Sequence, residues 1–390
     1  MSGAAAAPRA TEAERARLNA LFAELCAIPS ESGDEAAVRA HVVALLERAG
    51  YGCSVDAAGN VLTRWSDGPG GGRAGAEARG SVLLCAHLDT VPHGATPIAP
   101  VLVDDGWENA NDAILGADNK AAVAVMLLAA ERAAAEASGW DGPDIELLLT
   151  VEEETALAGA KRFDVSQLRS PFGYVYDHAT PIGEIVVASP TYYRLEAEFR
   201  GRAAHAGIRP EDGRNAIVAA ARAIAAMRIG RLDDETTANI GHIVGGRANA
   251  TNIVADRCTI LAETRSLDSA KVEAVVAEMV DHCHDAANEP ACECDLDVTV
   301  ERLFEGYRHK PSSPAVLVAE RALEACGYAP SHIVSGGAAD GNAFEVGGFH
   351  TVCLANGTER NHEPTERVSV AALEGMLDVT YALLDVVAAG

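Results

Sequence analysis

The sequence predicts an α/β fold: a mixed, mostly parallel sheet with helices on both faces, interrupted by an inserted ferredoxin-like α+β domain. Through the first half of the chain, continuous apolar runs alternate with amphipathic helical patterns, as in a sheet that is buried on both faces. From Tyr192 the order becomes β-α-β-β-α-β for about 110 residues, which is the ferredoxin-like order. Helices and buried strands then alternate again, so the last ~85 residues complete the first domain.

The elements of the first domain follow from local signals. In SGDEAAVRAHVVALLERAGYG a helix is expected, with Ser32 as its N-cap, Glu35 three residues later and Gly50 as its end. A strand at about 60 to 64 is followed by the loop DGPGGGRAGAEARG, which is too polar and flexible to pack. Apolar runs and helical spacing predict the strands SVLLCA, IELLLT, GYVYD and EIVVAS, and a long helix after Asp118.

The inserted domain and the return to the first domain are predicted in the same way. The alternating run YYRLEAEFRG precedes a helix at about 213 to 228, the strands TANIGHIVGG and DRCTILAETRS, a helix at about 269 to 287 and the strand DLDVTVERL. The helix SPAVLVAERALEACGY and the strand GFHTVCLAN come next. We therefore expect residues 1–190 and 307–390 to form one domain and residues 191–306 the other.

Composition limits the classes of function. Acidic residues outnumber basic ones by 57 to 31, for a formal net charge of -26, which argues against nucleic acid as a partner because phosphate binding needs clustered Lys and Arg. The N-terminal segment lacks the apolar core of a signal peptide, and no apolar stretch reaches the length of a membrane span. Nine cysteines without a Cys-x-x-Cys pair fit reduced thiols. These observations predict a cytoplasmic protein with no membrane partner.

One cysteine-rich and histidine-rich patch, DHCHDAANEPACEC, is weighed as a structural zinc site. Its histidines stand two positions apart at the end of a predicted helix, where they face different directions, and its last cysteines continue into an alternating strand. The usual zinc-ligand spacings, Cys-x-x-Cys or His-x-x-x-His, are missing, so no zinc site is expected in this patch. The residues concerned are His282, Cys283, His284, Cys292 and Cys294.

Ionisable residues stand at or just beyond the ends of the predicted strands. In VLLCAHLDTVPHG, His87 and Asp89 emerge on the same side of a strand end. Such a pair suits a metal-binding histidine oriented by a carboxylate, and equally a histidine at the edge of the core that hydrogen-bonds an acid. Asp118 precedes a long apolar helix, so it is either a ligand or an ordinary N-cap.

Three further strand ends carry candidate ligands. Glu152, Glu153 and Glu154 follow an apolar strand and repel one another unless something positive lies among them. Asp177 closes GYVYD, and His362 follows the last predicted strand in GTERNHEPTER. Taken together, two imidazoles and three carboxylates suit zinc or a similar divalent ion, with one carboxylate shared by two ions.

A series of motifs resembles a known family in the same order over nearly the whole chain. They are AHLDTVP, GADNKA, EEETALAGAKRFD, YVYDHATPIGEIVV, GRAAHAG, NATNIVAD, AETRSLD and GGAADGN. They resemble those of the dinuclear zinc exopeptidase family, which includes peptidase T, carboxypeptidase G and succinyl-diaminopimelate desuccinylase, and they are nearest to peptidase T-like members. The resemblance implies a metal-binding catalytic domain interrupted by a lid and dimerisation domain.

The resemblance also implies a role for each candidate. Asp118 would bridge two divalent ions, zinc in the first place with cobalt or manganese as alternatives. The catalytic residues would be Glu153 as general base and Asp89 as the partner that orients His87. The metal ligands implied by the resemblance are His87 and Asp177 on one ion, Glu154 and His362 on the other, and Asp118 on both.

Residues of the two domains are implied in substrate contacts. His205 resembles the family histidine that reaches the developing oxyanion. Arg265 could hold a substrate carboxylate, with Asn252 nearby, although a structural salt bridge at a strand end stays an alternative. Gly336 and Gly337 would let the backbone approach the substrate.

Two positions depart from the family pattern. Asn119 replaces a second aspartate that is common after the bridging one, and Ala339 stands where Ser or Thr is frequent before Asp340. Neither change removes the expected machinery, but both leave the substrate open.

The resemblance implies a homodimeric metallo-exopeptidase that hydrolyses short peptides, as a tripeptide aminopeptidase does. A carboxypeptidase or an N-acyl-amino-acid deacylase is the near alternative, because all three act on substrates with a free carboxylate. A non-catalytic peptide-binding or metal-binding protein is the alternative from another class, and Glu153 beside Glu154 speaks against it.

Overall fold

The computed structural model describes residues 9–65, 80–136, 140 and 142–390. The chain forms two compact units, one of Met1–Ala188 with His309–Gly390 and the other of Ser189–Arg308. Most of the predicted glycine-rich loop lies outside the described residues.

The first unit is built on a large sheet. In spatial order its strands are β1 (Gly52–Val55), β2 (Val61–Arg64), β6 (Asp144–Thr150), β3 (Ser81–His87), β7 (Gly173–His178), β16 (Thr351–Ala355) and β8 (Glu184–Ser189), and β15 (Ser331–Val334) pairs with β8. The pairs β3–β6, β3–β7, β7–β16 and β8–β15 are parallel. The pairs β1–β2, β2–β6 and β8–β16 are antiparallel. The predicted mixed, mostly parallel sheet is confirmed.

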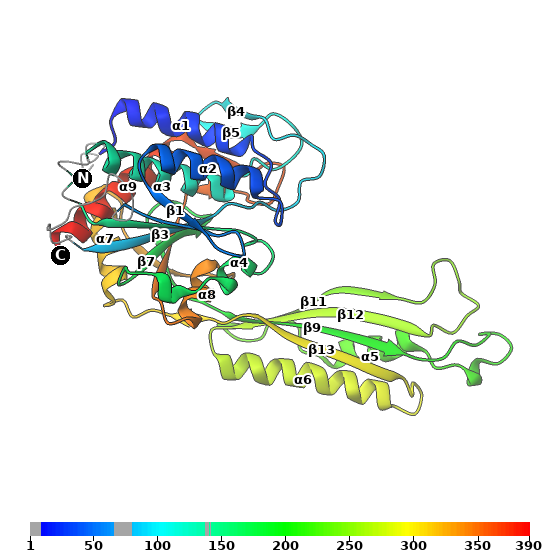
Figure 1. Ribbon diagram of the computed structural model, residues 1–390. Coiled ribbons are helices and arrows are strands. Elements are labelled where there is room, and N and C mark those ends of the chain that lie inside the picture. The colour runs from blue at the N-terminus through cyan, green and yellow to red at the C-terminus, as the bar shows by residue number, and fades with distance from the viewer. Residues whose placement is uncertain (1–8, 66–79, 137–139, 141) are drawn as a thin grey trace. The chain divides into compact units, whose positions relative to one another are not determined.

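Helices cover both faces of this sheet (Figure 1). On one face they are α1 (Glu12–Cys26), α2 (Ala36–Arg48), α3 (Ala117–Ala135), α7 (Pro314–Ala325) and α9 (Val370–Ala389), and on the other α4 (Ala158–Arg162) and α8 (Asp340–Val346), with a short 3-10 helix at Val165–Gln167. Along β3, Val82 and Leu84 belong to the hydrophobic core that contains residues of α1, α2, α3, α7 and α9. Leu83 and Cys85 alternate with them, do not belong to this core and are also fully buried. A strand that is buried on both faces does not alternate between apolar and polar residues. The continuous apolar run therefore predicted a strand in a sheet covered on both faces.

A smaller antiparallel sheet in the same unit was not predicted. It contains β17 (Thr358–Glu359), β18 (Arg367–Ser369), β5 (Gly106–Asn109) and β4 (Pro100–Val103) in that order. Its strands have two to four residues, too few to show a period in the sequence. The pairing of β18 with β5 fixes the position of residues 367–369, shortly after His362 in the chain.

The prediction that Ser32 caps the second helix was wrong. This helix begins at Ala36 with Glu35 at the N-cap position and no side-chain cap bond. The Ser32 hydroxyl instead donates a 2.8 Å hydrogen bond to Asp89. At the other end, Gly50 follows the C-cap with a φ of +93°.

The second unit has the predicted ferredoxin-like order. Its sheet runs β10 (Gly230–Arg231), β11 (Thr236–Gly245), β12 (Arg257–Ser266), β9 (Thr191–Arg200) and β13 (Asp295–Phe304), all antiparallel. The helices α5 (Ala216–Ala226) and α6 (Ser269–Asn288) pack on it. A 3-10 helix spans Pro210–Asp212, and the chain segment of this unit ends with β14 (Tyr307–Arg308), which is not a strand of this sheet. In chain order β9-α5-β11-β12-α6-β13 reproduces the expected pattern, and the unit has its own hydrophobic core.

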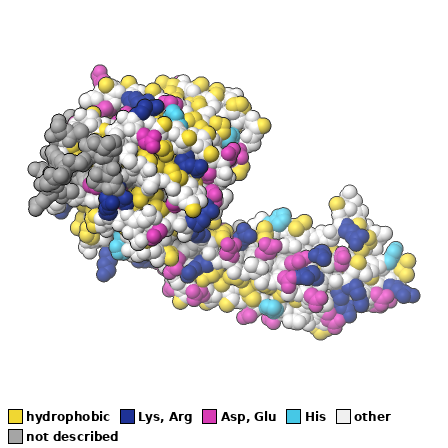
Figure 2. All heavy atoms as spheres, viewed as in Figure 1, with side chains coloured by type: hydrophobic (Ala, Val, Ile, Leu, Met, Phe, Trp, Pro, Cys, Tyr) yellow, Lys and Arg dark blue, Asp and Glu magenta, His cyan; other side chains and the backbone are white. Residues whose placement is uncertain are grey.

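The cysteines of this unit lie in its hydrophobic core, and its visible face carries charges of both signs. Acidic and basic side chains are interspersed over the visible face (Figure 2), and many are paired, as Arg228 is with Glu278. Cys283, Cys292 and Cys294 belong to the hydrophobic core, and no metal-binding group is found near them among the described residues. All nine cysteines of the chain are free thiols. No described helix has the length and apolar character that a membrane span needs.

Candidate metal centre

Three adjacent parallel strands bring most of the candidate ligands to one edge of the large sheet. His87 is the last residue of β3, Asp177 is the penultimate residue of β7, and Glu153 and Glu154 follow β6. Because β6, β3 and β7 are neighbours and run in parallel, their carboxyl ends meet at the same edge. Ligand sites of open α/β sheets lie at such an edge.

Asp118 occupies the centre of this group. Its Oδ1 lies 3.2 Å from Nε2 of His87, and its Oδ2 lies 3.4 Å from Nε2 of His362. Asn361 donates a 2.8 Å hydrogen bond to the same Oδ2. Asp118 is not the N-cap of the following helix, since that position belongs to Gly116. One carboxylate therefore presents a separate oxygen to each of two imidazoles.

A further carboxylate stands beside each imidazole. Asp177 Oδ1 is 3.7 Å from Nε2 of His87, and Glu154 Oε1 is 2.8 Å from Nε2 of His362. Two groups of three potential ligand atoms within 4.8 Å of one another are found among the described residues: His87 with Asp118 and Glu154, and His87 with Glu153 and Asp177. Glu153 thus reaches the same centre as the expected ligands.

The electrostatics of the group are dominated by crowded, buried carboxylates. Burial and the neighbouring Asp118 raise the pKa of Asp177 to about 8, and burial and Asp177 raise the pKa of Glu153 well above its usual value. Hydrogen bonds to Asp118 and Glu154 raise the pKa of His362 to about 10. The arrangement therefore favours positive charge between the carboxylates.

The donor set fits divalent metal ions. Two imidazoles and several carboxylates form the ligand chemistry that suits zinc and similar ions. Buried polar atoms around the group have no hydrogen-bond partner in the described part of the chain, and metal ions or ordered water satisfy such atoms in proteins. They are Oδ1 and Nδ2 of Asn119, Oδ1 of Asn361 and Oδ1 of Asp340.

Asp89 supports this group rather than joining it. It is fully buried and accepts the backbone N–H of Glu153 at 3.0 Å and of Glu154 at 3.1 Å. Its carboxylate lies 3.4 Å from Nδ1 of His87, and its backbone carbonyl oxygen lies 3.0 Å from the same nitrogen. Burial raises the pKa of Asp89, but the bonds to His87 and to the Glu153 N–H outweigh it and hold the pKa at about 2. Asp89 thus ties His87 to the glutamate pair.

The predicted substrate-contact residues have the following surroundings. Arg265 pairs with Glu263 at 2.9 Å and its guanidinium stacks 4.3 Å from the centre of the Tyr192 ring. His205 and Asn252 are exposed within the second unit. In the first unit, open space surrounds Gly336 where a side chain would project, and Gly337 donates its N–H to Ser335.

Sequence reasoning missed two residues of this group, Asn361 and Glu366. Asn361 contacts Asp118 directly, and its position beside His362 was the available signal. Glu366 is 2% exposed and accepts backbone N–H groups of the segment around Asp118. Nothing in the local sequence distinguishes Glu366 from the other acids of GTERNHEPTER.

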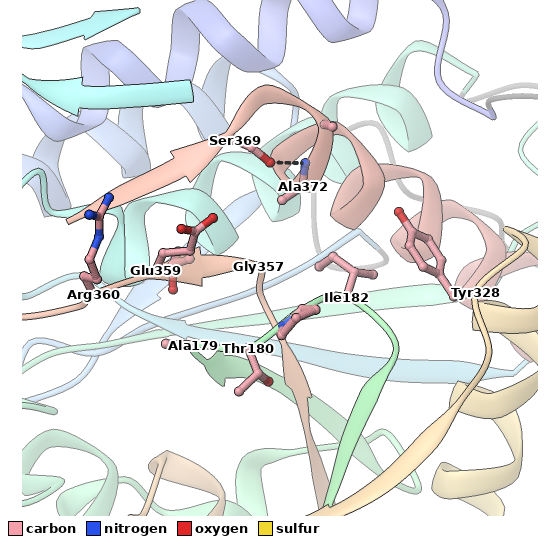
Figure 3. Close-up of a pocket in the computed structure, with 12 residues that line it drawn as sticks. Ala179, Thr180, Ile182, Tyr328, Gly357, Glu359, Arg360, Ser369 and Ala372 are labelled. Carbon is pink, nitrogen blue, oxygen red and sulfur yellow. Dashed lines mark hydrogen bonds between the residues drawn. The ribbon is translucent and has the colours of Figure 1, made fainter. Parts of the chain in front are cut away.

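A pocket of about 550 Å³ lies against the segments that carry two of the ligands (Figure 3). The loop that follows Asp177 and the segment that precedes His362 form adjacent parts of its wall, and Ser369, the N-cap of α9, and Ala372 in its first turn also line it. The two segments are joined by the N–H of Asn356, which donates to the carbonyl of His178, and by that of Gly357, which donates to Thr180. The lining residues are Ala179, Thr180, Pro181, Ile182, Tyr328, Gly357, Thr358, Glu359, Arg360, Ser369, Ala371 and Ala372.

Two family models match the chain. Residues 191–290 match the peptidase dimerisation domain, and residues 70–177 match peptidase family M28. The first match covers most of the second structural unit, and the second covers the strands that carry His87 and Asp177.

Several proteins are similar to this chain over 80% to 96% of its length. An aminopeptidase PepT from Bacillus cereus has a structure that is 35% identical, with a TM-score of 0.85, over 96% of this chain and 99% of that one. A tripeptidase from Staphylococcus aureus is 31% identical, with a TM-score of 0.88, over 96% and 99%. An uncharacterised protein, YqjE of Bacillus subtilis, is 35% identical over 80% of this chain and 82% of its own. A succinyl-diaminopimelate desuccinylase from Bordetella petrii is 26% identical over 94% and 96%.

Proposed function

Because this chain belongs to the family of peptidase T-like dinuclear metallopeptidases, we propose that it is a metal-dependent exopeptidase that hydrolyses short peptides, as a tripeptide aminopeptidase. The observation that carries the proposal is the Asp118 carboxylate, which faces His87 with one oxygen and His362 with the other. A carboxylate between two imidazoles, each with a further carboxylate beside it, supports a pair of ions that share one ligand.

In this proposal two ions bind to five side chains. His87, Asp118 and Asp177 hold one, and Asp118, Glu154 and His362 hold the other. Zinc is the proposed metal because imidazole and carboxylate ligands suit it, with cobalt or manganese as substitutes in vitro. When bound, such ions supply positive charge that makes a water molecule more acidic and polarises the scissile carbonyl.

Glu153 is the proposed general base. It accepts a proton from the attacking water as the oxygen bonds to the carbonyl carbon, and it delivers that proton to the leaving amine nitrogen when the C–N bond breaks. Glu153 is 9% exposed as a residue, and its carboxylate lies within the group of His87 and Asp177. Asp89 supports this role because it holds the Glu153 and Glu154 backbones together with the His87 ring.

The second unit is proposed to contact the substrate and to form a homodimer. The motif resemblance supports His205 at the oxyanion, Arg265 and Asn252 at a substrate carboxylate, and close backbone approach at Gly336 and Gly337 of the first unit. The match to a dimerisation domain supports association through this unit. Its β11 pairs with β10 only at residues 237–238 on that side, so among the described residues the rest of β11 is a sheet edge, and it exposes Ile243 and Val244.

The nine free thiols support a reducing, cytoplasmic location for the enzyme. An N-acyl-amino-acid deacylase is a second candidate, because a succinyl-diaminopimelate desuccinylase is similar over 94% of the chain.

A substrate panel tests the proposal. Unblocked tripeptides, dipeptides, N-blocked peptides and N-acetyl or N-succinyl amino acids are incubated with the zinc-, cobalt- or manganese-loaded protein, and release of free amine is measured. We expect turnover of tripeptides that requires a free N-terminus. Preferred cleavage of N-succinyl or N-acetyl amino acids would favour the deacylase. Metal binding without turnover of any amide, unchanged in Glu153→Gln, would favour a binding protein.

A further inference from the structure

Glu366 holds three backbone N–H groups in the interior of the first unit. Its Oε2 accepts the N–H of Leu115 at 2.9 Å and of Gly116 at 2.8 Å, and its Oε1 accepts the N–H of Asp118 at 2.9 Å. The residue is 2% exposed. A buried carboxylate that accepts three amide hydrogens forms charge-assisted bonds, which are stronger than bonds between neutral groups.

The segment that donates these bonds cannot satisfy its N–H groups by itself. Gly116 has a φ of +74°, and Asp118 and Asn119 have backbone angles outside the helical region, although α3 continues beyond them. The first N–H groups at a helix start have no acceptor within the helix, so the buried N–H groups of Leu115, Gly116 and Asp118 need another acceptor. Glu366 is that acceptor, and the irregular backbone is what turns the Asp118 side chain toward the imidazoles.

The same short segment that contains Glu366 also touches the side chain of Asp118. His362 and Asn361 contact Asp118 Oδ2, four and five residues before Glu366 in the chain. Two consecutive turns connect them, closed by the N–H of Glu363 on the carbonyl of Arg360 and the N–H of Glu366 on the carbonyl of Glu363. Asp118 is therefore held at its backbone and at its carboxylate by residues of one segment.

We propose that Glu366 is a positioning residue that fixes the backbone of Asp118 relative to His362 and thereby sets the affinity of the metal centre. The inference rests on the proposed function in one respect, namely that divalent ions bind at Asp118. Groups that hydrogen-bond to metal ligands typically contribute about 10- to 100-fold in metal affinity. Glu366 contacts the backbone of the ligand Asp118 rather than its side chain. This contact fixes the distance between Asp118 and His362, which lies in the same segment as Glu366.

The experiment measures metal affinity in two variants and a control. Glu366→Gln keeps the size of the side chain, but in either orientation its amide group turns N–H toward at least one backbone N–H. Glu366→Asp keeps the charge but withdraws the carboxylate by one methylene. Glu363→Gln is the matched control: it lies in the same segment, is exposed, and its carboxylate accepts a hydrogen bond from Thr365. The metal-free proteins are titrated with zinc against a chromophoric chelator, and cobalt derivatives are compared by visible absorption.

We expect both Glu366 variants to bind metal about 10- to 100-fold more weakly than the parent and to change the cobalt spectrum, while Glu363→Gln matches the parent. Circular dichroism and urea unfolding of the metal-free proteins control for folding. Parent-like affinity in Glu366→Asp would overturn the inference, because charge alone would then suffice. An equal loss in Glu363→Gln, or failure of both Glu366 variants to fold, would also overturn it. A parent protein that binds no metal would instead contradict the proposed function.

Discussion

Asp89→Asn is the substitution whose effect the structure specifies most fully. The fully buried carboxylate accepts the Glu153 N–H on Oδ1 and the Glu154 N–H and Ser32 hydroxyl on Oδ2, and Oδ1 also lies 3.4 Å from His87. Asparagine has the same shape, but its amide group donates. In either orientation it therefore faces at least one of the two backbone donors with an N–H.

The size of the effect follows from that lost bond. A hydrogen bond to a charged group contributes about 1.5–3 kcal/mol. At 1.36 kcal/mol for each factor of ten, loss of one such bond from the catalytic geometry lowers kcat/KM roughly 10- to 150-fold. The loss should appear mainly in kcat, because Asp89 positions His87 and Glu153 rather than the substrate.

The assay is steady-state hydrolysis of an unblocked tripeptide by metal-loaded protein, with Asp112→Asn as the control. Asp112 is an exposed aspartate in the same unit, so its replacement should leave kcat/KM within twofold of the parent. Metal content and thermal melting are measured in parallel. Parent-like kcat/KM in Asp89→Asn, with full metal content, would refute the assignment of Asp89 as a positioning residue.

Three further predictions concern the base, the metal and the helix that begins the described chain. Glu153→Gln should lower kcat by about 10²- to 10⁴-fold while metal content, measured by plasma emission, stays at the parent level; a kcat within tenfold of the parent would exclude Glu153 as the base. Chelation should abolish hydrolysis and lower the melting temperature, and zinc at 100 times its Kd should restore about 2.7 kcal/mol of stability for each site; a chelated protein that melts and reacts like the untreated one would contradict the metal centre. For Glu14, burial raises the pKa, but hydrogen bonds from Arg132 and Thr11 outweigh it and lower the pKa from 4.5 to about 2. A lowered folded-state pKa stabilises the fold above pH 4.5, and this stabilisation is lost as the pH falls from 4.5 toward 2. Urea unfolding at pH 7 and pH 3 should therefore show a smaller pH-dependent loss of stability in Glu14→Gln than in the parent, and equal losses would show that Glu14 is not involved.

The sequence predicted the large sheet because its strands are buried on both faces. The run that ends at His87 is apolar at every position from Val82 to Ala86, and such a run has few alternative structures. The order of elements in the second unit was predictable because its strands alternate and its helices are long. In both units the prediction used periods of several residues within one continuous segment.

The features that the sequence could not predict depend on contacts between distant segments. Ser32 had the spacing of a helix cap, but its hydroxyl bonds to Asp89, 57 residues away. The strands β17, β18, β5 and β4 are too short to show a pattern and form only because residues near 107 meet residues near 368. Glu366 is one acid among several in its segment, and its importance comes from amides about 250 residues earlier.

Anomalous X-ray diffraction from crystals of the zinc-loaded protein tests the central claim most directly. The account predicts two anomalous peaks about 3.5 to 4 Å apart, with one oxygen of Asp118 on each, His87 and Asp177 on the first ion, and Glu154 and His362 on the second. Ions bound elsewhere, or a fully active protein without an anomalous peak at Asp118, would contradict it.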